Sequence, residues 1–116
     1  MYVKINDNIK LKVKTCKTKS EISNGMMNRR FTDFNGMLFF MEPTNHCFYM
    51  KNCITPLDII FIDSNLEILK IFNNCPPCNE DDCERYCHDG KYVLEVPGGF
   101  CKKHNISVGD ICKIKF

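Results

Sequence analysis

Alternating hydrophobic and polar residues run through most of the chain and predict strands. Near the N-terminus, Ile9, Leu11 and Val13 alternate with lysines, and Asp7-Asn8 before them is a turn signal. This pattern predicts a hairpin with one solvated face. Further strands are expected at 37–41, 47–51, 57–62, 67–72, 91–96 and 111–116, with turns at 42–45, 63–65 and 108–110.

Two short helices interrupt this series of strands. Thr18 or Ser20 is suited to cap a helix that runs to about Met27, because a hydroxyl can accept from the first backbone N–H groups. A second helical turn is expected at 100–104. Consecutive strands with few helices predict an α+β fold: one compact domain over 1–116, mostly an antiparallel β-barrel or sandwich, with two or three short helices.

The composition excludes several functional classes. The chain has 116 residues, 44% of them hydrophobic and 26% charged, which is ordinary for a globular domain. No apolar run reaches the roughly 20 residues of a membrane span, and a formal net charge of +2 is too small to indicate nucleic acid. We therefore expect neither a membrane nor a nucleic-acid partner. The N-terminus lacks the apolar block of a signal peptide, so a cytoplasmic, intracellular location is expected.

Nine cysteines are the unusual feature of the composition. Because the count is odd, they cannot all pair within the chain. Five are scattered singly through mostly apolar stretches and are expected to pack as small hydrophobes in the core: Cys16, Cys47, Cys53, Cys101 and Cys112. The other four lie within a polar, proline-containing excursion at 73–90: Cys75, Cys78, Cys83 and Cys87.

Three structural interpretations of this cysteine cluster stay open. The four thiols, or three with His88, have the residue types of a structural zinc site, although only four residues separate Cys78 from Cys83. A disulfide, Cys78–Cys83 or Cys75–Cys87, would close the same loop. Free thiols are the third interpretation. Since the excursion offers almost no apolar side chains to bury, a covalent or metal link is physically attractive.

The same loop carries a CxxC sequence, Cys75-Pro-Pro-Cys78. Such a pair at the start of a helix has a lowered thiol pKa and suits dithiol exchange. The chain lacks the βαβ pattern of thioredoxin-like folds, however, and Asn73-Asn74 supplies no positive neighbour. A thiol-redox enzyme is therefore kept only as an alternative, and no catalytic residue is assigned.

A series of short motifs follows in a fixed order between residues 22 and 111. They include Gly25-Met26-Met27-Asn28-Arg29, Gly36-Met37-Leu38-Phe39, Phe48-Tyr49-Met50-Lys51-Asn52, Pro56-Leu57-Asp58 and Tyr92-Val93-Leu94-Glu95-Val96-Pro97-Gly98-Gly99. In this order they resemble the DUF192 family, also called UPF0127, of small proteins without an established activity. Tyr49 stands where the family usually has tryptophan, and Cys53 where it has threonine. The resemblance implies a compact, barrel-like α+β domain and no particular reaction.

Polar residues inside these otherwise apolar motifs are candidates for a binding site, since unpaired buried charges are costly. In one interpretation Lys51 and Arg29 hold an anionic group, Asn52 orients it, and two acids position the basic residues: Asp58 and Glu95. In the other, Lys51–Asp58 or Arg29–Glu95 ion pairs only fix the fold.

The sequence thus favours a non-enzymatic binding or accessory module for a small, anionic ligand. The main alternative is a structural or interaction component of a larger assembly with protein partners.

Overall fold

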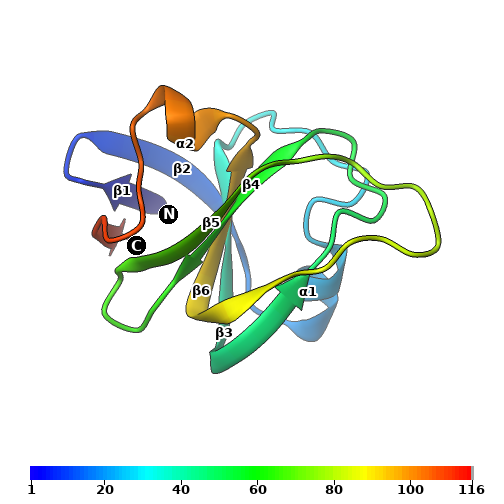
Figure 1. Cartoon of the computed structure of the whole chain (residues 1–116). Coiled ribbons are helices and arrows are strands. Elements are labelled where there is room, and N and C mark those ends of the chain that lie inside the picture. The colour runs from blue at the N-terminus through cyan, green and yellow to red at the C-terminus, as the bar shows by residue number, and fades with distance from the viewer. Residues whose placement is uncertain (116) are drawn as a thin grey trace.

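Seven strands and two short helices form the fold of residues 1–115, the part of the chain that the computed structural model describes. The strands make one sheet in the order β5-β4-β6-β3-β2-β1-β7, which curls into a half-barrel (Figure 1). In chain order the elements are β1 (Tyr2–Ile5), β2 (Ile9–Cys16), α1 (Lys19–Asn24), β3 (Gly36–Phe48), β4 (Leu57–Ile62), β5 (Ile68–Cys75), β6 (Tyr86–Pro97), α2 (Phe100–Lys103) and β7 (Cys112–Lys115).

The sheet is mixed. β2 and β3 run parallel, with Val13 opposite Gly36, whereas the other neighbouring strands in the described sheet pair antiparallel. The long connection at 17–35 makes this parallel pair possible, because parallel neighbours must be joined by a crossover. Here the crossover contains α1. The domain is therefore richer in strands than the predicted α+β class suggests.

The turn predicted at 42–45 is wrong, because β3 continues through it. β3 pairs with β6 on both sides of this segment, and the register shifts between Phe40 and Thr44. A bulge of this kind accommodates Pro43, which cannot donate to the ladder. The polar excursion is also shorter than predicted, since β5 reaches Cys75 and β6 already begins at Tyr86.

α1 begins as the sequence predicts but is shorter. Thr18 caps it and accepts from the Glu21 N–H, while the Glu21 side chain accepts from the Thr18 N–H, a complete capping box. The helix ends at Asn24, because Gly25 takes a positive φ of 42°. Within the described residues no helix is long and apolar enough to cross a membrane.

The central strands supply hydrophobic side chains to both faces of the sheet. On what we call the α2 face, Leu38, Ile60 and Leu94 pack with Val3 and Cys101. On the opposite face, the α1 face, alternate residues of the same strands form a second core that includes Met37, Phe39, Ile59, Phe61 and Val93, with Ile22 of α1 packed against it. Alternation along a strand thus explains why β4 is buried at every position.

Candidate functional site

Two acidic side chains are buried in the centre of the sheet, and they lie on opposite faces. Asp58 on β4 is 0% exposed and Glu95 on β6 is 3% exposed. Asp58 pairs across the strands with Val96, and Glu95 pairs with Ile59 and Met37. Since successive residues of a strand point to opposite faces, Asp58 faces α2 and Glu95 faces α1.

Asp58 is fully satisfied by backbone N–H groups. Its Oδ1 accepts from the amides of Asn74 (2.7 Å) and Gly99 (3.0 Å), and its Oδ2 accepts from the amide of Cys101 (2.9 Å). These bonds tie β4 to β5 and to the start of α2. A buried carboxylate with three such donors is a structural connection, and it does not line the pocket described next.

Glu95 has no such partners. No donor among residues 1–115 is within hydrogen-bond distance of its carboxyl group, and no salt bridge reaches it. Every fully enclosed side-chain oxygen or nitrogen among residues 1–115 has a hydrogen-bond partner. Since the carboxyl oxygens of Glu95 have none, they are not fully enclosed and retain some access to open space.

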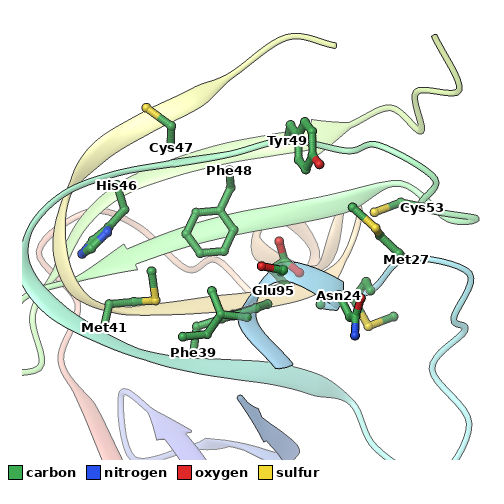
Figure 2. A pocket seen from close by; sticks show the side chains of 14 residues that line it. Asn24, Met27, Phe39, Met41, His46, Cys47, Phe48, Tyr49, Cys53 and Glu95 are labelled. Atoms are coloured by element: carbon green, nitrogen blue, oxygen red, sulfur yellow. The ribbon is translucent and has the colours of Figure 1, made fainter. Parts of the chain in front are cut away.

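That open space is a pocket of about 270 Å³ on the α1 face. α1 and the turn after it form one wall, and β3 with its following segment forms another. Figure 2 shows the Glu95 carboxyl near the middle of the labelled side chains, with Phe48 to one side, Met27 to the other and His46 at the far edge. The lining is otherwise largely aromatic and sulfur-containing: Met26, Met27, Phe39, Met41, Phe48, Tyr49 and Cys53.

This apolar lining changes the acidity of Glu95. Burial disfavours the charged carboxylate and raises the pKa of Glu95 from 4.5 to about 8. At neutral pH the group is therefore mostly protonated, and it becomes a carboxylate only in mildly alkaline solution or beside a positive charge. A pocket residue whose pKa is shifted close to neutral pH is typical of binding and catalytic sites.

The structure does not bring the five predicted polar residues together. Arg29 is exposed and lines a separate hollow beside Lys14. Lys51 donates to the backbone oxygen of Glu80, and its Nζ lies 3.8 Å from Asp81 Oδ1. Neither the Lys51–Asp58 nor the Arg29–Glu95 ion pair is found among the described residues.

Asn52 has a conformational role. It takes a positive φ of 58°, which asparagine tolerates better than most residues. Its N–H donates to Cys78 and its C=O accepts from Asn28, so its backbone joins three segments of chain. Its side chain is exposed and does not line the Glu95 pocket.

The cysteine cluster forms two disulfides in place of a metal site. Cys78 pairs with Cys83, one of the predicted pairings, but Cys87 pairs with Cys47 across β3 and β6 and leaves Cys75 as a buried thiol. No group of three or more His, Cys, Asp or Glu in the described chain could hold a metal ion. The zinc interpretation is therefore not supported, because three of the four sulfurs are in disulfides and the fourth, that of Cys75, is a buried thiol.

The free thiols behave as core residues. All five are buried: Cys16, Cys53, Cys75, Cys101 and Cys112. This confirms core packing for four of the five scattered cysteines, with Cys47 the exception. Burial raises the pKa of Cys75 to about 11, whereas dithiol exchange requires a thiolate. Cys75 is thus poorly suited to the redox role that its CxxC sequence suggested.

Sequence reasoning found Glu95 but missed the rest of its pocket. Met27 ends a predicted helix, and Met41 and Phe48 lie in predicted strands; none of them signals a pocket, because a pocket wall and a core have the same apolar composition. The Cys47–Cys87 bond was missed as well, since it depends on the register of β3 against β6, where the two residues lie directly opposite. No local signal in the chain specifies that register.

The fold and the pocket define a small, β-rich protein with a hollow beside a curled sheet. A family comparison agrees with the motifs: the DUF192 family, described as an uncharacterised ACR, matches residues 1–114. The chain belongs to this family.

Two solved structures share the fold over 97% of this chain. One is a protein of unknown function from Novosphingobium aromaticivorans, with a TM-score of 0.85 and 26% identity over 84% of its own length. The other, from Sinorhizobium meliloti, is described as a candidate transcription regulator, with a TM-score of 0.84 and 28% identity over 91% of its length. A search of curated proteins found no match.

Proposed function

We propose that the protein is a small-molecule-binding module whose ligand enters the pocket on the α1 face and contacts Glu95. The observation that carries this proposal is the carboxyl group of Glu95. The residue is only 3% exposed, yet its carboxyl group has no hydrogen-bond partner among residues 1–115. Buried polar groups are normally satisfied. A ligand in the pocket would supply the missing partner.

The size and lining of the pocket support a small ligand with an apolar portion. Its volume of about 270 Å³ is just below the roughly 300–1,000 Å³ of typical ligand sites. Hydrophobic walls with one well-placed polar group are the usual composition of such sites. This proposal replaces the predicted anionic ligand, because the pocket offers an acid and no lysine or arginine from the described chain.

The other candidate roles have less support. Four large hydrophobic side chains are exposed among residues 1–115, Tyr2, Ile54, Val108 and Ile111, and none of them lines the pocket. A nucleic-acid role is suggested only by the description of the Sinorhizobium meliloti protein. A formal net charge of +2 gives it no electrostatic basis.

The disulfides also bear on where this binding takes place. Two disulfides in one small domain favour an oxidising compartment, in contrast to the intracellular location expected from the sequence. We expect the denatured, unreduced protein to take up five alkyl groups at its free cysteines and nine after reduction. Nine before reduction, in protein purified without reductant, would contradict this location.

Binding is tested by protein-observed NMR with three sets of small probes: organic amines, neutral alcohols and amides, and carboxylates. We expect at least one set to shift the backbone amides of the pocket, including those of Gly25, Phe39 and Cys53, at millimolar concentration. If no set shifts these amides, the proposed function is wrong.

A matched pair of variants locates the site. Asn24→Trp places a large side chain at the exposed rim of the pocket, whereas Lys102→Trp makes the same change on the exposed surface of α2. The first should weaken binding at least tenfold and the second should leave it unchanged. Equal binding by both variants, with amide spectra otherwise native, would place the ligand elsewhere.

A further inference from the structure

We propose that the ligand of the Glu95 pocket is an organic ammonium ion, either a protonated amine or a quaternary ammonium group on a small apolar body. Its positive charge would lie against the Glu95 carboxylate and the neighbouring aromatic rings. This inference rests on the proposed function, since it names the chemical class of the ligand for that same pocket.

The charge of the pocket selects a cation over an anion. Glu95 is the only acidic residue of the lining, and its described walls contain no lysine or arginine. The one basic side chain, His46, has its Nε2 2.6 Å from the backbone oxygen of Glu42. An anion would therefore meet a buried acid without a compensating charge, whereas a cation would give that acid the partner it lacks.

The aromatic rings favour an organic cation in particular. Phe39 and Phe48 line the pocket with ring centroids 5.0 Å apart and planes at 79°, so the two rings present differently oriented surfaces. Tyr49 also lines the pocket, on the side shown at the top of Figure 2, but the Arg85 guanidinium already lies over its ring, 4.5 Å from the centroid, so the two phenylalanines are the rings left for the ligand. A desolvated ammonium group is attracted to the faces of such rings, and its alkyl groups bury apolar area against them.

A metal ion fits the pocket poorly. Hard cations such as Ca²⁺ take six to eight oxygen ligands, and the lining offers a single carboxyl group. No cluster of three metal-ligating residues of the His, Cys, Asp and Glu types occurs within residues 1–115. An ammonium ion needs no such coordination shell, since one carboxylate and the ring faces satisfy it.

Binding of a cation should be coupled to the release of a proton from Glu95. The titratable groups that interact with Glu95 are three thiols from different elements: Cys16 on β2, Cys53 before β4 and Cys75 on β5. The pKa values of these thiols lie at about 11 to 12, so the thiols stay neutral while Glu95 titrates. His46 and Tyr49 complete the titratable lining of the pocket.

The test uses three probes of similar shape. Choline and its uncharged isostere 3,3-dimethylbutan-1-ol differ chiefly by a positive nitrogen in place of a carbon, and 3,3-dimethylbutanoate carries a negative charge. Titrations followed by NMR at pH 6.5, 7.5 and 8.5 should show choline binding at least tenfold more tightly than the alcohol at pH 8.5. Choline has a fixed charge, so its affinity should fall about tenfold per pH unit well below the pKa of Glu95. Calorimetry in two buffers of different ionisation enthalpy should record the release of nearly one proton at pH 7.

The variant Glu95→Gln separates the two proposals. It should abolish the preference for choline and the pH dependence, while the uncharged alcohol still shifts the pocket amides. Equal affinity for choline and the alcohol in the native protein, or tighter binding of 3,3-dimethylbutanoate, would overturn the ammonium proposal and leave a small-molecule pocket in place. If none of the three probes, nor any of the wider sets, shifts the pocket amides, both proposals fail.

Discussion

The two faces of the sheet treat a buried acid in opposite ways. On the α2 face, Asp58 accepts three hydrogen bonds from backbone N–H groups and holds β4, β5 and α2 together. On the α1 face, Glu95 lies one register position away, opposite Ile59, and has no donor from the described chain. Burial is nearly equal, so exposure alone does not separate a structural acid from a candidate functional one. The hydrogen-bond partners do.

The largest expected effect comes from removing the satisfied acid. Asp58→Ala would leave three buried N–H groups without an acceptor, and we expect a loss of about 5 kcal/mol in the free energy of unfolding. Asp58→Asn keeps the oxygen position that two of these amides share, so we expect about 2 kcal/mol. Urea unfolding monitored by circular dichroism measures both.

A control for these variants is Asp63→Ala. Asp63 also accepts from two backbone amides, those of Asn65 and Glu67, but in a half-buried turn where water can replace it. Its loss should cost about 1 kcal/mol. Equal losses for Asp58→Ala and Asp63→Ala would contradict the structural role of Asp58.

A smaller effect is expected from the exposed disulfide beside the pocket. Cys47–Cys87 spans 40 residues of sequence and Cys78–Cys83 spans 5, so chain-entropy arguments predict losses of at most about 4 and about 2 kcal/mol for the respective double serine variants. Urea unfolding measures both losses.

Loss of the Cys47–Cys87 bond should affect one face of the sheet more than the other. Cys47 lines the pocket, so amide hydrogen exchange should speed up near Cys47 in its double variant and remain slow at Cys101 on the α2 face. Uniform acceleration on both faces would show that the two faces are not stabilised separately.

Replacing Glu95, the acid without a hydrogen-bond donor, should raise the free energy of unfolding, whereas replacing Asp58 lowers it. The pKa of Glu95 is about 8 when folded against 4.5 as the ordinary value, so the folded state holds the proton more tightly and stability falls as pH rises from about 4.5 to 8. Glu95→Gln removes this penalty. We expect it to stabilise the protein by about 3 kcal/mol at pH 7 and by less than about 1 kcal/mol at pH 5.

Thermal unfolding of the native protein and Glu95→Gln across this pH range measures the difference. Glu67→Gln replaces an exposed acid and is the control. It should leave the stability of the protein unchanged at every pH in this range. A stabilisation by Glu95→Gln that is the same at pH 5 and pH 7 would mean that Glu95 is not held protonated by burial.

The sequence predicted local elements better than their long-range pairing. The Thr18–Glu21 capping box and the alternating strand at Ile9–Val13 are encoded within a few residues, and both are found. The continuation of β3 past Pro43, its parallel pairing with β2 and the Cys47–Cys87 bond depend on register between distant segments, which no short motif specifies.

The same limit applies to the candidate site. Glu95 and Asp58 are recognisable as polar residues in apolar strands, but the sequence does not show which one finds donors. Asp58 is satisfied by amides 16 to 43 residues away, and only the folded chain brings these to it. The same long-range folding leaves Arg29 exposed and directs half-buried Lys51 to the backbone oxygen of Glu80, away from Glu95 and Asp58.

The pairing of β1 with β7 sets the order in which the protein can be completed during its synthesis. β1 joins β2 through a short turn, yet its other edge is covered only by β7, with Tyr2 opposite Lys115. The ribosome must therefore release β7 before β1 gains its second neighbour. Until then β1 presents an open edge to other chains, so deletion of β7 should expose that edge permanently.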